Sequence, residues 1–362
     1  MYVFSALCTV LVLALAPGGW DHAGFDAEDS YYNPDESQIN AGTIGDLTQR
    51  WSVALREKGG ACGGPSAPLI SGGAGGSVIA TDERGISSYR AMTGRLAWQF
   101  DWDDPDDSST PSMAVSGDVL VAANSDCNSM SDPDGRIVAL DLATGRVRWR
   151  IASPFPVASF VVDKGVVVVS GTSPSDEQMT VAYRAADGRE LWRKPRHEAS
   201  GVSANGRILL VKGRSTTAVA IGTGVPLWAH KRIWYAESAT PAADRFLVSD
   251  GTALTALRAS DGAMLWTAEG KQSALLATDG RRVYRAAERT VEALDVHTGR
   301  RLWWRQLPVI AGQPVRAGGL VYTGGPVLNA ATGSVVATVE GSQVAAGGRL
   351  FTVSRQRLTV LE

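Results

Sequence analysis

The feature that most constrains the fold is a motif that recurs along most of the chain. The segment "ALDLATGRVRW", Ala139 to Trp149, returns as "ALDVHTGRRLW" from Ala293 to Trp303, with weaker copies such as "ALRASDGAMLW" from Ala256 to Trp266. The glycines of the seven copies are separated by 51, 43, 36, 38, 37 and 34 residues and are Gly94, Gly145, Gly188, Gly224, Gly262, Gly299 and Gly333. A period in this range indicates a repeat architecture.

Each repeat predicts four short strands, and the copy around Gly299 shows them most clearly. Turn signals at 279–280, 288–289 and 298–299 divide the runs 273–278, 281–286, 290–295 and 300–306, in that order. Closely spaced turn signals between β-rich runs favour an array of antiparallel sheets. Four strands in a repeat of this length are typical of a propeller blade.

The two ends of the chain together supply an eighth blade. After Gly333 three strands are predicted within 343–361, and no fourth strand follows them. Near the start, "LTQRWSVAL" at 47–55 is a fourth strand without the preceding three, and it has Trp51 in the repeat position. We therefore predict an all-β, eight-bladed propeller over residues 47–362, closed by pairing of 47–55 with the strands of 343–361. Closure leaves no open sheet edge around the ring.

The repeated residues are interpreted as structural. Gly145 falls where a hairpin turn requires positive φ, and Trp149 can cover the seam between two blades while donating its indole N–H to a backbone carbonyl. Burying one Trp stabilises the fold by up to about 4–6 kcal/mol. Seven of the eleven tryptophans occupy this one position: Trp51, Trp98, Trp149, Trp192, Trp228, Trp266 and Trp303. A cofactor needs one site rather than seven.

Composition excludes some partners. The formal charge is -2, no basic stripe is present, and 44% of the 362 residues are apolar. Such a chain can bury a large core, and it has no field that would draw nucleic acid or an anionic membrane surface. We expect a monomeric propeller with no nucleic-acid partner.

The first residues differ from the rest of the chain. Tyr2 to Ala16 contains no charge and no turn residue, which is typical of a signal-peptide core or a membrane helix. We interpret residues 1–20 as a signal peptide or membrane anchor and 21–46 as an N-terminal extension. A cleaved signal, a retained anchor and a buried helix of a cytosolic protein stay open as alternatives. The favoured location is extracytoplasmic, either secreted or membrane-anchored.

Two cysteines, Cys62 and Cys127, lie in Gly-, Ser- and Asp-rich loops. In an exported protein such a pair predicts a disulfide, with two unpaired thiols as the alternative. The bond would close a loop of 65 residues, which the chain-entropy model values at about 4 kcal/mol. The histidines are scattered and far in sequence from both cysteines, so a metal site there is poorly supported.

Three loop segments are candidates for binding. Asp101–Pro111 and Asn124–Gly135 lengthen one repeat, and insertions in repeat proteins often project from the binding face. Asp101–Asp107 contains five aspartates, but the spacing of a calcium loop is absent, which favours a solvated surface loop. Lys231–Ser238 combines cations with aromatic residues, a composition typical of interaction surfaces. Its alternative is a loop that packs its aromatics over the propeller rim.

From about residue 26 to 362, the spaced motifs make the chain resemble the pyrroloquinoline quinone (PQQ)-repeat, or quinoprotein-like, β-propeller family. That family includes quinoprotein dehydrogenases and scaffolds such as the outer-membrane assembly lipoprotein of Gram-negative bacteria. Tyr32-Asn33-Pro34, ahead of Leu47 to Trp51, resembles the segment that opens the first blade of the dehydrogenases. Because enzymes and non-enzymes share the repeat, the resemblance implies the fold more strongly than the activity.

The dehydrogenases of that family have two adjacent cysteines beside the cofactor, Ca²⁺ held by Glu, Asn and Asp, and an Asp base. No Cys-Cys pair and no haem-type C-x-x-C-H occur here, and the other residues match no motif. No catalytic, cofactor-binding or metal residue is therefore assigned. The expected function is a non-catalytic propeller that binds a protein or cell-envelope ligand through rim loops and the channel mouth. The alternative is a diverged PQQ- and Ca²⁺-dependent dehydrogenase acting on an alcohol or sugar.

Overall fold

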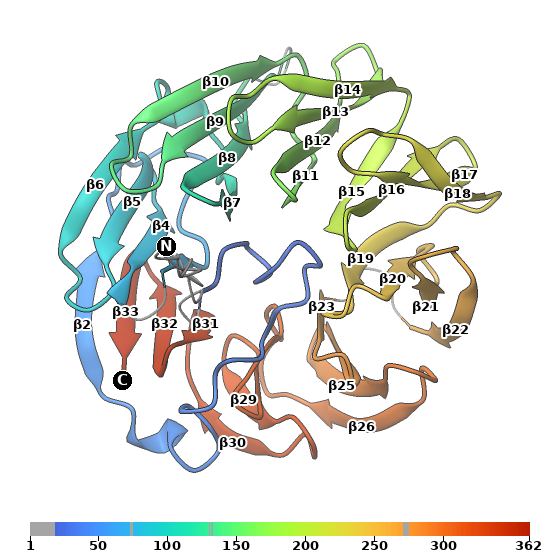
Figure 1. Cartoon of the computed structure of the whole chain (residues 1–362). Helices are drawn as coiled ribbons and strands as arrows, with labels where there is room; N and C mark the ends of the chain where they lie inside the picture. Colours follow the sequence, from blue (N-terminus) through green and yellow to red (C-terminus); the bar gives the residue numbers. More distant parts are fainter. Residues whose placement is uncertain (1–18, 73–74, 130, 132, 271–274) are drawn as a thin grey trace, which may run out of the picture.

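The computed structural model describes residues 19–72, 75–129, 131, 133–270 and 275–362. They form eight sheets of mainly four antiparallel strands, arranged as blades around a common centre (Figure 1). The prediction of an eight-bladed propeller is therefore confirmed. The short 3-10 helices η1 (Ile44–Asp46) and η3 (Pro105–Asp107) lie in connections.

Each blade begins with its innermost strand. Blade 1 is β3 (Leu69–Ser71), β4 (Ser77–Thr81), β5 (Gly85–Arg90) and β6 (Leu96–Asp101); blade 2 is β7 (Ser112–Ser116), β8 (Val119–Ser125), β9 (Gly135–Asp141) and β10 (Val147–Ser153). Blade 3 is β11 (Ser159–Asp163), β12 (Val166–Thr172), β13 (Gln178–Arg184) and β14 (Glu190–Pro195); blade 4 is β15 (Glu198–Ser203), β16 (Arg207–Lys212), β17 (Ser215–Ala220) and β18 (Pro226–His230).

The second half of the ring continues the pattern. Blade 5 is β19 (Tyr235–Ala239), β20 (Arg245–Ser249), β21 (Ala253–Arg258) and β22 (Met264–Glu269); blade 6 is β23 (Leu275–Thr278), β24 (Arg282–Ala287), β25 (Thr290–Asp295) and β26 (Arg301–Gln306). Blade 7 is β27 (Val315–Ala317), β28 (Leu320–Tyr322), β29 (Pro326–Asn329) and β30 (Val335–Thr338), with β1 (Tyr32–Asn33) as a fifth strand that pairs in parallel with β27.

Blade 8 closes the ring, as predicted. Its strands are β31 (Ser342–Ala346), β32 (Arg349–Ser354) and β33 (Arg357–Leu361) from the C-terminal end, with β2 (Gln49–Ala54) as the outermost strand. The β2–β33 pairing is antiparallel and places Trp51 opposite Val360 and Ser52 opposite Thr359. In Figure 1 the blue β2 lies beside the red β33.

The repeat tryptophans lie at the seams between blades. Each indole N–H donates to a carbonyl of the next blade at 2.7–3.1 Å: Trp51 to Ala91, Trp98 to Leu142, Trp149 to Ala185, Trp192 to Ile221, Trp228 to Ala259, Trp266 to Val296 and Trp303 to Ala330. Each ring also covers the repeat glycine of that next blade, so that a Cβ on Gly299 would lie 2.6 Å from Trp266 Cε3. The repeat glycine therefore combines positive φ with a space that the indole fills.

Most of the predicted signal or anchor, residues 1–18, lies outside the described part of the chain. Within the described ranges, no helix is both long and apolar enough to cross a bilayer.

Candidate functional site: the central cavity and its rim

The N-terminal extension crosses the centre of the ring. Residues 20–36, here called the strap, form the dark blue trace inside the ring in Figure 1. The strap bends through positive φ at Phe25, Asp29 and Tyr31, which non-glycine residues adopt only when the surroundings hold them there. Its backbone supplies hydrogen-bond partners to strand groups that face the channel and would otherwise lack them.

The strap contacts the innermost strand of every blade, and it meets the blades in chain order. The hydrogen bonds, 2.6–2.9 Å long, join Trp20 to Ile70, Asp21 to Val115, His22 to Val162, Ala27 to Ser203, Glu28 to Ala239, Ser30 to Thr278, Tyr31 to Arg316 and Asn33 to Ala345. Most of these partners lie towards the C-terminal ends of the innermost strands, so the strap closes that end of the channel.

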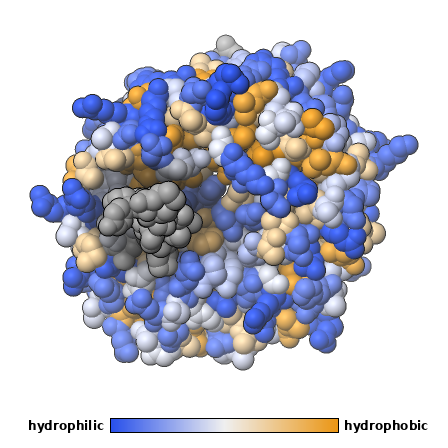
Figure 2. All heavy atoms as spheres, viewed as in Figure 1, coloured by the Kyte–Doolittle hydropathy of each residue, from blue (hydrophilic) through white to orange (hydrophobic). Residues whose placement is uncertain are grey.

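A cavity of about 640 Å³ lies above the strap, on the blade 7, 8, 1 and 2 side of the channel. Strap residues Trp20, Ala23 and Tyr31 form its floor, and residues at the starts of innermost strands, such as Ser112 and Ser342, line its mouth. The volume is in the range of small-molecule sites. Figure 2 shows one face of the ring, which is mostly hydrophilic and hollowed near its centre.

The described lining residues of this cavity include no Lys, Arg, His, Asp or Glu. Acidic residues of the strap, Asp26, Glu28 and Asp29, lie outside this lining. Burial raises the pKa of Asp26 to about 6, while burial together with the charge of Asp26 raises the pKa values of Glu28 and Asp29 to about 7. Glu237 of β19 adds to the shift at Asp29. The polar side chains of the cavity lining are therefore uncharged hydroxyls and amides, set among apolar residues.

This lining offers PQQ no cationic partner. The quinone is a planar tricarboxylate, and a buried anion requires cationic or multiple N–H partners. Trp20 and Tyr31 provide aromatic surface, but no described lining residue provides a guanidinium or ammonium group. No group of three or more His, Cys, Asp or Glu side chains within the described ranges is arranged to hold a metal ion.

Three loops form a lobe beside the cavity mouth. They are residues 55–68, 101–111 and, within the described part of the chain, 125–129, 131 and 133–135, here called the rim lobe. Ser66 and Thr110 of these loops also line the cavity. A disulfide joins Cys62 to Cys127, in agreement with the sequence prediction. It links the connection before blade 1 to the β8–β9 loop of blade 2, so both loops are fixed relative to the mouth.

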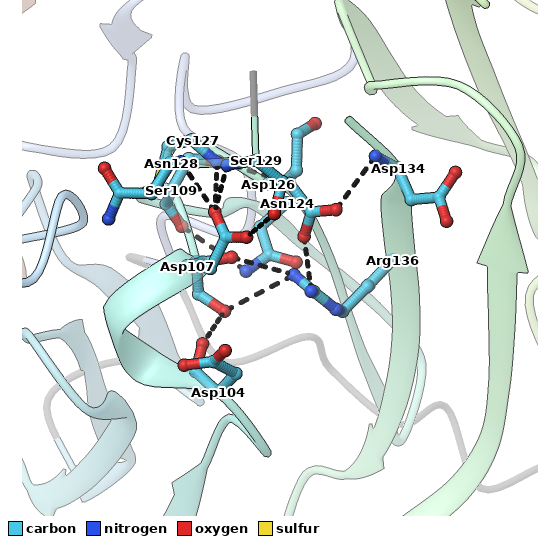
Figure 3. A network of polar contacts seen from close by, with 12 residues as sticks. Asp104, Asp107, Ser109, Asn124, Asp126, Cys127, Asn128, Ser129, Asp134 and Arg136 are labelled. Carbon is cyan, nitrogen blue, oxygen red and sulfur yellow. Dashed lines mark hydrogen bonds and ion pairs between the residues drawn. The ribbon is translucent and has the colours of Figure 1, made fainter. Parts of the chain in front are cut away.

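Asp107 organises the rim lobe from within. Its carboxylate accepts the backbone N–H groups of Cys127, Asn128 and Ser129 at 2.7, 2.6 and 3.3 Å, together with the Ser129 hydroxyl. These hydrogen bonds hold the pKa of Asp107 well below its usual range. Figure 3 shows Asp107 directed at this loop, with Arg136 lying between Asp107 and Asp126.

The other aspartates of the acidic loop also have partners in the protein. Ion pairs join Asp101 to Arg56, Asp103 to Arg150 and Asp106 to Lys58, and Asp104 accepts the N–H of Asp106. These contacts place the carboxylates in structural roles within the rim lobe.

The two aromatic residues of the predicted loop Lys231–Ser238 differ in burial. Trp234 is buried, with the Arg232 guanidinium 5.3 Å from its ring centroid, whereas Tyr235 is exposed at the start of β19. The buried Trp agrees with the alternative of aromatics packed over the rim.

Comparison with solved structures finds the same fold in a quinohemoprotein alcohol dehydrogenase and in BamB. The quinohemoprotein alcohol dehydrogenase of Comamonas testosteroni superposes with a TM-score of 0.72 at 13% identity, covering 96% of this chain and 81% of that chain. BamB of Moraxella catarrhalis gives 0.60 at 19% identity, covering 87% and 97%. At these identities the likeness concerns the fold alone.

Curated relatives also fall in both branches. The dehydrogenase subunit of a quinone alcohol dehydrogenase from Gluconacetobacter polyoxogenes is 26% identical over 206 residues, which are 52% of this chain and 27% of that protein. BamB of Burkholderia pseudomallei (strain K96243) is 26% identical over 186 residues, 46% of this chain and 45% of that protein. The matches thus span about a quarter to a half of the length of these relatives.

A family model described as "Outer membrane protein assembly factor BamB" matches residues 17–212, 134–241 and 214–337. These ranges cover most of the ring together with the strap. The chain therefore belongs to this family of PQQ-repeat β-propellers.

Proposed function

We propose that this protein is a non-catalytic, extracytoplasmic scaffold that binds a partner protein through the rim lobe and the cavity mouth. The main support is the rim lobe itself, since Cys62–Cys127 and the Asp107 contacts fix a polar surface beside the cavity. A surface that is ordered before binding loses little conformational entropy when a partner docks. The relatives named as outer membrane protein assembly factors agree with this proposal.

An extracytoplasmic location is part of the proposal. Disulfides persist in oxidising compartments, and residues 2–16 have the composition of an export signal or anchor. Fractionation of cells that express the full chain tests this point, and recovery of reduced protein in the cytosol would contradict it.

Site-specific photo-crosslinking in cells tests the binding surface. A photoreactive amino acid replaces the exposed Glu57 of the rim lobe in one variant and the exposed Arg301 of the outer strand β26 in a matched control. We expect a discrete adduct from position 57 and none from position 301. Equal adducts at both positions, or none at position 57, would refute binding through the rim lobe.

The alternative is a quinoprotein dehydrogenase acting on an alcohol or sugar, which the dehydrogenase relatives favour. It is tested by titrating the protein with PQQ and Ca²⁺ and then assaying dye-linked oxidation of alcohols and aldoses. Because the cavity lining offers no cationic side chain, we expect neither micromolar PQQ binding nor activity. Micromolar PQQ binding or dye-linked oxidation would replace the scaffold proposal with the dehydrogenase.

A further inference from the structure

A second pocket, of about 460 Å³, lies between blades 4 and 5. Three arginines line it: Arg207 from the start of β16, Arg245 from the start of β20 and Arg258 from the end of β21. The backbone N–H of Asn205, another lining residue, donates to Glu28 Oε1 of the strap at 3.4 Å. The pocket thus opens at the strap end of the ring, away from the cavity mouth and the rim lobe.

The positive charges of this pocket are only partly neutralised. Arg245 forms an ion pair of 2.7 Å with Asp244, and Arg258 one of 2.8 Å with Asp261. The Arg207 guanidinium has no hydrogen bond or ion pair to any described residue, and its Nε is buried without a partner. A buried N–H without an acceptor is unfavourable, and an oxyanion in the pocket would supply the missing acceptor.

Strand register adds an independent sign that an anion is missing. Arg245 and Arg258 are direct partners across β20 and β21, and like charges in that arrangement are destabilising. In blade 6 the corresponding pair is Arg282 opposite Asp295, which places a carboxylate in the equivalent position. Blade 5 therefore has an arginine where blade 6 has a carboxylate.

Further cations and carboxylates lie around the pocket. His297 Nδ1 lies 3.1 Å from Arg245 Nη2 and acts there as an acceptor, and Lys164 contacts Asn205 at 2.7 Å. The carboxylates in the neighbourhood are Asp244, Asp261, Glu28 and Asp163, the last of which accepts the Gly206 N–H at 2.9 Å. Two of them are paired with arginines, so Arg207 is the guanidinium available to an incoming ligand.

We propose that this pocket binds the phosphate group of an anionic ligand, with Arg207 as the principal contact and Arg245 and Arg258 beside it. Guanidinium forks match phosphate oxygens in a bidentate geometry that a lysine does not reproduce. The phosphate could belong to a free metabolite-sized compound or to an anionic lipid headgroup, since both present the same oxygens.

Calorimetric titration of the full-length protein with inorganic pyrophosphate, in a phosphate-free buffer, tests the free ligand. Co-sedimentation with phosphatidylglycerol vesicles, against phosphatidylcholine vesicles, tests the headgroup. The variants are Arg207→Gln and the half-exposed Arg258→Gln, with Arg282→Gln as the matched control at the same strand position in blade 6. Circular dichroism verifies that each variant is folded.

We expect at least one probe to bind saturably, with affinity reduced about tenfold or more by Arg207→Gln and unchanged by Arg282→Gln. Pyrophosphate binding without vesicle binding identifies a free ligand, and selective sedimentation with phosphatidylglycerol identifies the lipid. If Arg207→Gln does not fold, Arg258→Gln gives the same comparison. Absence of binding by both probes, or equal losses in Arg207→Gln and Arg282→Gln, overturns the proposal. Neither result depends on the rim lobe.

Discussion

At the scale of single residues, the ring depends on one contact that is repeated between blades. The Trp266 indole covers Gly299 and donates to the Val296 carbonyl at 2.8 Å, so it packs and hydrogen-bonds across the same seam. The sequence predicted the turn glycine from its positive φ and the Trp from its spacing. It could not reveal that the two touch, because the partners belong to different repeats.

We predict that Trp266→Ala lowers the free energy of unfolding by about 3–5 kcal/mol. The residue is only 8% exposed, and truncation leaves both a cavity and an unpaired carbonyl. Trp304→Ala is the control, since Trp304 is 52% exposed on the neighbouring blade and a surface change of this kind shifts stability by about 0.5 kcal/mol or less. Equilibrium denaturation followed by circular dichroism measures both, and equal losses would contradict the seam interpretation.

The carboxylate of Asp107 illustrates a different residue-scale effect. It accepts three consecutive N–H groups of the β8–β9 loop. No feature of the sequence "DWDDPDD" distinguishes Asp107 from the four other aspartates in this role. We predict faster amide exchange at Cys127–Ser129 in Asp107→Asn, because an amide oxygen is a weaker acceptor than a carboxylate. Hydrogen exchange with mass spectrometry measures it, and Asp103→Asn should leave that loop at the wild-type rate.

At the scale of elements, prediction succeeded where the pattern was periodic. The second, third and fourth strands predicted for the Gly299 repeat agree to within one residue with β24, β25 and β26. The strap has no such period, and its eight blade contacts are hydrogen bonds that involve backbone groups of distant residues. Those contacts form only in the folded ring. The sequence of residues 21–46 therefore predicted an N-terminal extension but not its path across the channel.

The strap predicts an unusual dependence of stability on pH. Glu28 and Asp29 have pKa values of about 7 in the folded protein and ordinary values of about 4 when unfolded. The folded state therefore binds more protons between these values, and linkage makes stability increase as the pH falls from about 8 to about 5.

Thermal denaturation across this pH range tests the dependence. Asp29→Asn should raise the midpoint at about pH 8 and flatten the slope, because the amide carries no charge to bury. Asp103→Asn, a side chain that is 80% exposed in the rim lobe, should retain the wild-type slope. Parallel curves for all three proteins would show that the strap carboxylates are not responsible.

At the scale of the whole molecule, the ring is held closed by one strand pair between the two ends of the chain. Ser52 Oγ of β2 lies 3.0 Å from Thr359 Oγ1 of β33, and the two residues are direct partners in register. The sequence predicted this closure because 47–55 is a fourth strand without the preceding three, and 343–361 contains three strands without a fourth. The arginine-lined pocket between blades 4 and 5 was not predictable, since its arginines come from two repeats and converge only in the folded ring.

A disulfide between these strands should lock the ring. Ser52→Cys combined with Thr359→Cys would join residues 307 apart in the chain, and the chain-entropy model allows a gain of as much as about 5 kcal/mol. We expect a higher melting temperature under oxidising conditions and none of the gain after reduction or in either single variant. Complete disulfide formation without any rise would show that the closure is not where unfolding begins.

The strap also constrains the order in which this molecule can be completed. Residues 20–36 are synthesised before any blade exists, yet their partners extend to Ala345 in the last one. The earliest part of the chain must therefore wait, unbound, until nearly the whole protein has been made, and such long-range contacts form slowly. A strap that resists protease would then be a sign that all eight blades are in place.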